Sequence, residues 1–540
     1  MSRLSTHVLM TAATAVLLAC LFPLLAVVVA AFSGRSDAVG GLVATVLPSY
    51  ALNTIGLVIV TGIGASVIGV TAAWLVTMTR FPGRRLLEIG LVLPFAFPAY
   101  VMAYAYTHVL DHPGIVQSTL RDVFGWGPRD YWFPEIRSFG GAATLLTLVL
   151  YPYVYLLTRA AFISQSSAQF IVARTLGHGP WRTFFTVSLP MTRTAILGGT
   201  LLVAMETIAD FGTVSFFGVP TFATGIYQTW FSMGDRTAAA QLATCLLTFA
   251  LLLAILERVT RQSEVLTHGK RREKIERFEL KGIRAAGAML ACGLPVLLGA
   301  VLPAVALVIM AQRSEQSLFS SRYLDFTTNS LILASVAALV TVLAAILLGG
   351  ARRTMPNALT RSAAQIARLG YAVPGGVIAV GLMVPAAAFD NALDTFMRDT
   401  FGISTGLLIT GSIALLVLAY MTRFLAAAIA GYESGASAIS DNLDDAARVL
   451  GASPARSLIR VQVPLLAPSL LTAVLIVFVD VMKELPATLI LRPFNFDTLA
   501  VQAFRLASDE RLTGAAVPSL VIVGIGLIPT MLLCRRIGRD

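Results

Sequence analysis

Residues 173–190 read ARTLGHGPWRTFFTVSLP, and residues 447–464 read ARVLGASPARSLIRVQVP, 274 positions later in the chain. Eight of the 18 aligned positions are identical. Asn53 and Asn329 also match, at an offset of 276, so the correspondence extends well beyond this stretch. Because self-similarity at a fixed spacing indicates a duplicated architecture, we predict that the chain consists of two homologous halves.

The rest of the chain is strongly apolar. Of its 540 residues, 56% are hydrophobic and 13% are charged, and the mean hydropathy of +0.79 excludes a soluble domain. We therefore predict an all-α polytopic membrane protein with about 12 transmembrane helices, arranged as two homologous six-helix halves. The predicted spans are 8–32, 54–79, 86–110, 139–163, 194–217, 237–259, 285–310, 328–350, 366–389, 405–432, 467–491 and 513–534.

The positive charge follows the predicted topology. The net charge is +11, from 40 Lys and Arg against 29 Asp and Glu. With the N-terminus inside, most cations fall in cytoplasmic loops, as the positive-inside rule requires, so we predict no nucleic-acid partner. Both termini are then cytoplasmic. Residues 1–257 and 285–540 form the predicted halves, and 258–284, with nine Lys or Arg, form a cytoplasmic linker that contacts anionic lipid or, alternatively, has a regulatory role.

The repeated stretch predicts two short helices joined by a glycine turn. Gly451 follows the helical run 443–450 as a C-terminal cap, Ser453 caps the next helix, and Pro454 takes its first position. Such a loop on the cytoplasmic side is suited to docking into a cleft on a partner, and an ordinary tight loop is the alternative. The first half has the corresponding residues Gly177, Gly179 and Pro180.

The second copy resembles the Glu-Ala-Ala loop of ABC-importer permeases, whose pattern is E-A-A-x3-G-x9-I-x-L-P. It supplies Asp445, Ala446, Ala447, Gly451 and then VQVP at 461–464. The first copy departs at 171–172, where Ile and Val replace Glu and Ala. The resemblance implies coupling loops at about 164–193 and 433–466. The implied ATPase-coupling residues are Ala173, Arg174, Gly177, Pro180, Arg182, Asp445, Ala446, Ala447, Arg448, Gly451, Pro454 and Arg456.

The resemblance further implies a type I ABC importer fold and two copies of an ABC ATPase subunit, one docked on each loop. No Gly-x4-Gly-Lys-Ser/Thr phosphate loop occurs in the sequence. We therefore expect ATP to be used by the partner ATPase. The chain itself is predicted to be a transport subunit that is not an enzyme and binds no cofactor.

Charged residues lie inside two of the predicted spans. Glu206 and Asp210 are one turn apart in the fifth span, and Asp480 and Glu484 are at matching positions in the eleventh, beside Lys483. A charged group at the centre of a bilayer costs about 2.5 to 3.5 kcal/mol, so such residues often mark a pathway. We predict a translocation path that attracts a cation. The alternative is that Lys483 pairs with a carboxylate and the others bond neighbouring helices.

Three segments resemble the fused two-half permeases of ferric-iron uptake: LPFAFPAYVMAYAY (93–106), METIADFGTVSFFG (205–218) and KELPATLILRPFNFDTLA (483–500). This resemblance implies Fe³⁺ as substrate, a periplasmic or extracellular iron-binding protein as partner, and the bacterial cytoplasmic (inner) membrane as location. Thiamine and polyamine permeases remain alternatives. A cation-coupled secondary transporter, whose four carboxylates carry protons, is the alternative from another class, and the doubled loop argues against it.

Two further sets of residues are candidates at the outer side. His108 and His112 have the spacing of one helical turn and could bind a metal at the entrance, with a plain helix end as the alternative. The outer loops 218–236 and 492–511 are candidates for docking the binding protein, unless their polar residues only cap and turn the loops. The matched positions are Thr224, Gln228, Asp235, Thr498, Gln502 and Asp509.

Overall fold

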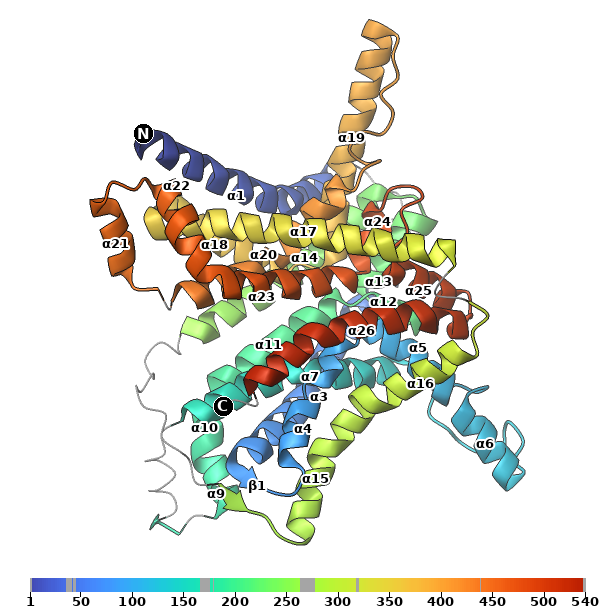
Figure 1. Ribbon diagram of the computed structural model, residues 1–540. Helices are drawn as coiled ribbons and strands as arrows, with labels where there is room; N and C mark the ends of the chain where they lie inside the picture. Colours follow the sequence, from blue (N-terminus) through green and yellow to red (C-terminus); the bar gives the residue numbers. More distant parts are fainter. Residues whose placement is uncertain are drawn as a thin grey trace. The chain divides into compact units, whose positions relative to one another are not determined.

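A computed structural model describes residues 2–34, 41, 45–165, 175–177, 179–262, 277–316, 320–437 and 439–537. The described residues are helical almost throughout (Figure 1). They include 10 helices long and apolar enough to cross a membrane, and 12 spans if each of two bent helix pairs counts as one. The predicted all-helical fold is confirmed.

The long helices follow the predicted order. They are α1 (Ser2–Phe32), α3 (Leu47–Met78), α7 (Phe139–Ser164), α14 (Arg236–Gln262), α15 (Ile283–Val296) continued through η4 (Leu297–Val301) into α16 (Leu302–Gln312), α17 (Ser321–Thr354), α19 (Gly375–Phe401), α20 (Ala414–Ala436), α22 (Pro454–Ser457) continued through η6 (Leu458–Gln462) into α23 (Val463–Met482), and α26 (Leu512–Ile537).

The third predicted span, 86–110, is broken by proline. In the structure the pieces Arg84–Ala96 and Ala99–Phe124 meet at 99°. Pro98 caps the second piece in an extended conformation, because proline lacks the N–H that a continuous helix needs. The pieces are α4 (Arg84–Gly90) with η1 (Leu93–Ala96), then α5 (Ala99–Leu110) with α6 (Ile115–Phe124).

The fifth and eleventh predicted spans end early. α11 (Arg193–Ala209) stops before Asp210, and α23 stops at Met482, so both breaks coincide with the acidic residues. At its start α11 bends by 70° from the segment Trp181–Met191. The short helices are α9 (Pro180–Thr183), η2 (Phe184–Ser188), α10 (Leu189–Met191), α12 (Gly212–Phe216), α13 (Phe222–Tyr227), η3 (Gln228–Ser232), α18 (Ala358–Leu369), η5 (Gly370–Ala372), α21 (Asp441–Val449), α24 (Pro486–Leu491) and α25 (Leu499–Ser508).

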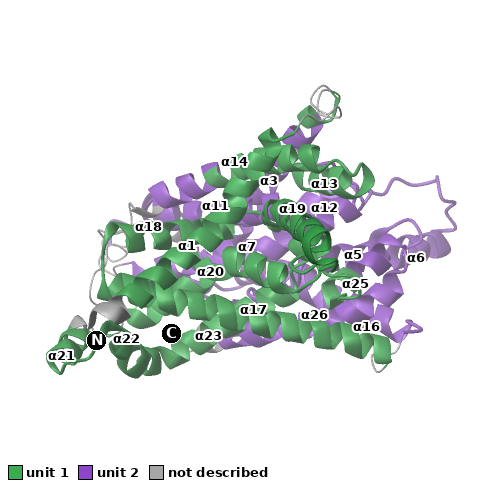
Figure 2. Ribbon diagram, turned by 90° about the horizontal axis from the view of Figure 1, so that it is seen from above, with its two compact units in different colours: residues 1–48, 222–251, 317–502 green, residues 49–221, 252–316, 503–540 purple. Residues whose placement is uncertain are grey.

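The chain forms two compact units that do not follow the predicted halves (Figure 2). In unit 1, α1 packs on α17, α18 and α19 of the second half. In unit 2, α16 and α26 pack on α5 of the first half. Each unit thus combines segments of both halves. Unit 1 is 1–48, 222–251 and 317–502, and unit 2 is 49–221, 252–316 and 503–540.

Close backbone contact explains how α1 joins unit 1. Gly381 of α19 lies against the carbonyl of Pro23, and an added Cβ would be 2.1 Å from that oxygen. Pro23 has no N–H, so it leaves the carbonyl of Ala19 without its helical donor. The Thr422 hydroxyl of α20 lies 3.5 Å from that oxygen and can donate to it.

A small parallel pair of strands lies in unit 2. β1 (Thr79–Arg80) follows α3 and pairs with β2 (Phe278–Glu279), which belongs to the C-terminal end of the predicted linker. The Arg277 side chain donates to the carbonyl of Thr77 at 3.0 Å. Residues 263–276 of the predicted linker lie outside the described part of the chain.

Candidate functional site

The first helix break is organised by Asp210. This residue is extended, with φ −67° and ψ 127°, and follows the last residue of α11. Its carboxylate accepts hydrogen bonds from the backbone N–H groups of Thr213 and Val214, both at 3.1 Å, and from the Thr213 hydroxyl at 3.0 Å. Asp210 therefore caps α12 in the manner of an N-cap residue.

Glu484 does the same at the second break. Its carboxylate accepts from the backbone N–H groups of Ala487 at 3.0 Å and Thr488 at 3.2 Å, and so caps α24. In addition, Arg423 of α20 lies 3.2 Å from Glu484, and the two side chains are 11% and 2% exposed. Gly375 makes room for this pair, because an added Cβ would be 2.5 Å from both charged groups.

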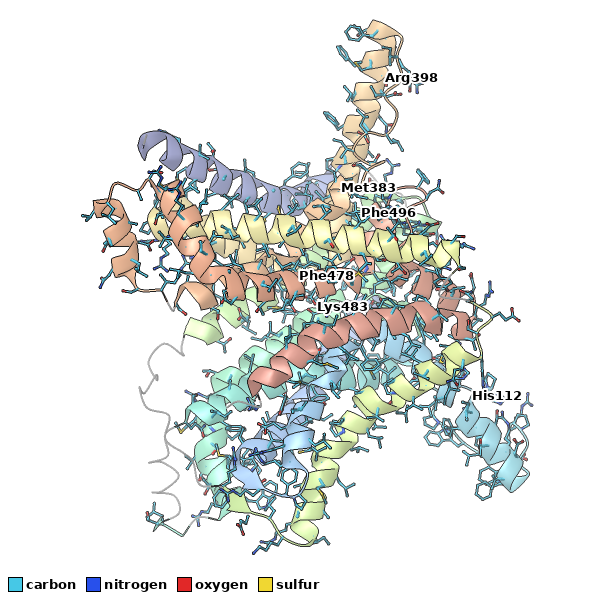
Figure 3. The ribbon with its side chains drawn as sticks, in the orientation of Figure 1. His112, Met383, Arg398, Phe478, Lys483 and Phe496 are labelled. Carbon is cyan, nitrogen blue, oxygen red and sulfur yellow. The ribbon has the colours of Figure 1, made fainter. Side chains whose placement is uncertain are left out.

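The two breaks differ in charge. Lys483, labelled in Figure 3, forms an ion pair with Asp480 at 2.8 Å, so the second half pairs both of its acids with cations. Among the described side chains, no Lys, Arg or His nitrogen lies within 4.0 Å of the Glu206 or Asp210 carboxylate. The alternative to a translocation path is that Lys483 pairs with a carboxylate and that the other acids bond neighbouring helices. The contacts of Asp480 and Glu484 agree with this alternative. Within the described part of the first half, Glu206 and Asp210 have no cationic partner.

The repeated loop of the second half has the predicted helix–glycine–helix form. α21 is followed by Gly451, whose φ of +80° lies in the left-handed region that favours glycine. The Ser453 side chain accepts from the N–H of Arg456 at 3.4 Å, and Pro454 begins α22. In the first half, Gly177 has φ +76° and α9 begins at Pro180. Ala173 and Arg174 lie outside the described residues.

One face of α21 is exposed: Val449 is 87% exposed, and Leu450, which follows the last residue of the helix, is 86% exposed. Asp445, Ala446 and Arg448 are also exposed, and Asp445 pairs with Arg448 at 3.4 Å. Ala447 is buried, so it packs the helix onto the protein rather than facing outward. Of the other predicted coupling residues, Arg182 and Arg456 are exposed, and Pro454 is half-buried.

The residue that holds α21 in place is Asp444, which the sequence did not single out. Arg353, in the last turn of α17, lies 2.6 Å from its carboxylate, and the side chains are 15% and 8% exposed. The Gln462 amide donates to Asp444 at 2.9 Å, and Ser457 lies within 3.3 Å. Burial alone raises the pKa of Asp444, but these hydrogen bonds and the Arg353 charge outweigh it and lower the pKa below its usual value.

The same Arg353 side chain also fixes the chain before α21. It donates to the carbonyls of Ala436 at 2.8 Å and Ile439 at 2.9 Å. The helix α21 is therefore joined to α17, α20 and η6 by one buried polar network. Arg353 lies just after a predicted span, so a role in holding the end of that span could have been suggested from the sequence. Its partner Asp444 is 91 residues away, and no spacing rule identifies it.

Matched asparagines hold the predicted outer loops. Asn53 donates to the carbonyl of Pro220 at 2.9 Å, and Asn329 donates to that of Asp497 at 3.2 Å. Both contacts join the start of a half's second span to its outer loop. The repeat seen at these positions thus has a structural role in each unit.

Two of the predicted docking residues serve as caps. The Asp235 carboxylate accepts from the N–H of Ala238 at 2.9 Å, and the Thr498 hydroxyl accepts from the N–H of Val501 at 3.4 Å. Thr498 and Gln502 are buried, each 5% exposed. Of the remaining predicted residues, Gln228 and Asp509 are exposed, and Thr224 is half-buried.

The predicted histidine pair does not share a helical face. α5 ends at Leu110, Asp111 is extended, and His112 lies beyond the helix end (Figure 3). The following Pro113 explains the early end, because the residue before a proline disfavours the helical conformation. Within the described ranges, no group of three or more His, Cys, Asp or Glu is placed to hold a metal ion.

Two repeated sets of membrane helices, each with an acid-capped break, and the helix–glycine–helix loop described in the second half are the arrangement expected of a membrane permease. The chain belongs to the family of binding-protein-dependent transport system inner membrane components, whose pattern matches residues 65–263 and 341–539. It is therefore a multi-pass permease subunit of the inner membrane. The double match supports the duplication seen in the sequence.

Relatives of known function are similar over different lengths. The Fe(3+)-transport system permease protein of Haemophilus influenzae is 26% identical over 491 residues, which cover 89% of this chain and 88% of that protein. The molybdenum transport system permease protein of Escherichia coli is 30% identical over 191 residues, 34% of this chain and 80% of that protein. The sulfate transport system permease protein of Escherichia coli is 28% identical over 39% of this chain and 72% of that protein.

Proposed function

We propose that the chain is the fused permease of an ATP-driven, binding-protein-dependent importer of ferric iron that works by alternating access. The observation that carries this proposal is the two-half match to the Fe(3+) permease, which covers 88% of that protein. The molybdenum and sulfate relatives match only 34% and 39% of this chain. The partners are a periplasmic or extracellular iron-binding protein and two copies of an ATPase subunit, and both termini are cytoplasmic.

Contacts within unit 1 support the proposal that a movement of the ATPase is transmitted to the membrane helices. The exposed face of α21 is the surface on which an ATPase would dock, and the Asp444–Arg353 ion pair joins it to α17. Beyond the Gly451 turn, α22, η6 and α23 run without interruption to the break at Glu484. A displacement of the coupling loop is therefore passed along one helix to the acid-capped break.

The charge at the breaks suits a ferric cargo. Fe³⁺ is a hard cation that prefers oxygen ligands, and Glu206 and Asp210 supply carboxylates that no cation neutralises within the described side chains. Carboxylates held in this way attract a cation without requiring a permanent metal site. Molybdate and sulfate are anions, and the same charges would repel them.

The function is tested by uptake into vesicles that contain the permease, its ATPase and its binding protein. We expect ATP-dependent accumulation of ferric iron, and no accumulation of thiamine, polyamine, molybdate or sulfate. Accumulation of one of these instead of iron would overturn the substrate assignment. Uptake driven by a proton gradient in vesicles without the ATPase would indicate the secondary transporter. Vesicles containing an ATPase variant that binds but does not hydrolyse ATP are the control.

Asp210 offers a matched pair of variants that separates charge from capping. Asn is a good N-cap residue, so Asp210→Asn should preserve the fold while lowering iron uptake by about tenfold, equivalent to roughly 1.4 kcal/mol of lost attraction. Asp210→Ala should also lower the free energy of unfolding by about 1 kcal/mol. The measurements are uptake rate and thermal unfolding. Normal uptake by a stable Asp210→Asn variant would leave Asp210 with the capping role alone.

A further inference from the structure

A small pocket in unit 1 is lined mainly by arginine. It has a volume of about 300 Å³ and lies where the end of α17 meets α18. None of the residues that line it is acidic. They are Arg352, Pro356, Arg361, Ala364, Gln365 and Arg368. One water takes up roughly 30 Å³ in the liquid, so the pocket has room for a group as large as a phosphate.

The positive charge of this pocket is only partly balanced. Glu433, in the last turn of α20, pairs with Arg352 at 2.6 Å and also with Arg368. These three side chains are 36 to 44% exposed, so a ligand can reach them. Among the side chains that the structure describes, no Asp or Glu oxygen lies within 4.0 Å of the Arg361 guanidinium. Three arginines against one glutamate leave an excess of two positive charges.

The arginines of α18 project from one face of the helix. Arg361, Gln365 and Arg368 are separated by four and three positions, so their side chains lie on the same side. All three are exposed, whereas Ala363 and Ala367 are buried. Arg361 lies in the first turn of α18, which contains no acidic residue. The helix dipole disfavours a cation at this end and favours an anion, so a bound anion would offset an unfavourable charge.

An arginine–glutamate cluster in unit 2 differs from this pocket. Arg159 of α7 donates to the Glu88 carboxylate at 3.0 Å through Nε and at 2.7 Å through Nη2, and Arg84 donates to it at 3.1 Å. The three side chains are only 8 to 13% exposed. Arg84 also donates to the carbonyl of Val76 at 2.6 Å. The protein itself satisfies these buried arginines, whereas the arginines of the pocket in unit 1 remain open to a ligand.

The pocket lies at the end of unit 1 that carries the coupling loop. Arg353, which follows Arg352 in α17, is paired with Asp444 of α21 at 2.6 Å. α18 joins the membrane helices α17 and α19 and packs on α1, α17 and α20 (Figure 1). The Asn357 amide, at the start of α18, lies 3.4 Å from the Met10 sulfur of α1 and can donate to it. α18 is therefore a short helix at the level where the membrane helices end.

This position favours a lipid as the source of the anion. Val8 of α1, two residues before Met10, is apolar and exposed. In a membrane such a side chain contacts acyl chains, so a lipid beside α1 can place its charged group near α18. The cytoplasmic leaflet carries anionic lipids, and basic pockets between membrane helices on this side bind their headgroups.

We propose that the pocket formed by Arg352, Arg361 and Arg368 binds the phosphate group of an anionic phospholipid of the cytoplasmic leaflet. Glu433 fixes the position of Arg352 and Arg368, and Arg361 supplies the charge that no described carboxylate balances. The bound lipid connects α18 to the membrane surface beside the end of α17 that holds α21. This inference goes beyond the proposed function and does not depend on the substrate.

The test measures lipid binding to the purified permease by native mass spectrometry. The probes are phosphatidylglycerol and cardiolipin, which are anionic, zwitterionic phosphatidylcholine, and inorganic phosphate. We expect the wild type to bind the anionic lipids more tightly than phosphatidylcholine. Arg361→Gln should lower the affinity for the anionic lipids by about fivefold, because it removes one cation near the membrane surface and leaves both contacts of Glu433 in place. Arg361→Lys, which keeps the charge, should lose less affinity.

Arg85→Gln is the matched control. Arg85 is an exposed residue in the first turn of α4, which also lies between two spans, so the substitution removes the same charge from a comparable helix. It should leave the affinity for anionic lipid unchanged. The melting temperature of each variant without added lipid shows whether it folds, and the rise in melting temperature on adding cardiolipin, expected for the wild type and smaller for Arg361→Gln, is a second measure of binding.

Three results would overturn the proposal. The first is equal affinity of the wild type and Arg361→Gln for the anionic lipids. The second is binding of inorganic phosphate without retention of phospholipid, which would make the ligand a free anion. The third is loss of ATPase co-purification in Arg361→Gln with unchanged lipid binding, which would assign the arginines to the ATPase interface. A failure of the permease to import iron would overturn the proposed function and leave these binding measurements unaffected.

Discussion

Glu484→Ala is expected to destabilise the protein strongly. It leaves the Arg423 guanidinium, which is 11% exposed, without its counter-ion in the interior of unit 1. Removing one partner of a buried ion pair typically costs about 3 to 5 kcal/mol, and loss of the cap on α24 adds about 1 kcal/mol. Thermal or denaturant unfolding of the purified permease measures the change in free energy.

A double-mutant cycle shows whether the ion pair is the cause. Glu484→Gln keeps an oxygen that can cap α24, and combining it with Arg423→Met removes both charges. The double variant should therefore be more stable than the sum of the two single effects predicts. Strict additivity would exclude the ion pair as the source.

Gly375→Ala should also lower the free energy of unfolding, because its Cβ would lie 2.5 Å from both charged groups. Gly198→Ala is the matched control, because no atom lies within 4 Å of an added Cβ there.

Gly451→Val is expected to abolish ATP-driven uptake while the permease remains in the membrane. The open surroundings of Gly451, with no atom within 4 Å of an added Cβ, show that space is not the constraint. The constraint is the φ of +80°, which a β-branched residue adopts at a cost of about 1 to 3 kcal/mol. The turn between α21 and α22 would then change, and the exposed face of α21 would no longer fit its partner.

The control for this substitution is Gly451→Asn, since asparagine tolerates the left-handed region far better than valine does. We expect Gly451→Asn to retain most of the uptake. Co-purification of the ATPase and the rate of uptake per ATP hydrolysed are the measurements. Normal coupling in the valine variant would show that the turn does not orient the docking face.

The sequence alone predicted the repeated loop well, because its conformation depends on local chemistry. Gly451, Ser453 and Pro454 act on residues within one turn of themselves, and the structure confirms the cap and both helices. The approximate positions of the spans were also predictable, since hydropathy over a window of about 19 residues reports burial in lipid. The same averaging hid the breaks, because a few residues at Asp210 or Glu484 scarcely change the mean.

The functional contacts that were missed are those between distant residues. Arg423 and Glu484 are 61 positions apart, and Glu88 and Arg159 are 71 apart, so no spacing rule brings them together. One local signal was available. Pro486 favours the first position of a new helix, and its place two residues after Glu484 could have marked the start of α24. The predicted one-turn spacing of His108 and His112 on a helix is not present for a similar local reason, because Pro113 disfavours the helical conformation of His112 and α5 ends at Leu110.

The exchange of segments between the two compact units also constrains biosynthesis. Unit 2 begins with residues made early in translation, but it is completed only by residues 503–540, which include α26. Unit 1 needs α1, which is inserted hundreds of residues before α17 to α20 are available to pack on it. The apolar faces of α1 and α5 are therefore synthesised before the helices that pack on them. Unit 1 therefore cannot be completed before residue 502 is made, and unit 2 cannot be completed before its last segment, 503–540, is made.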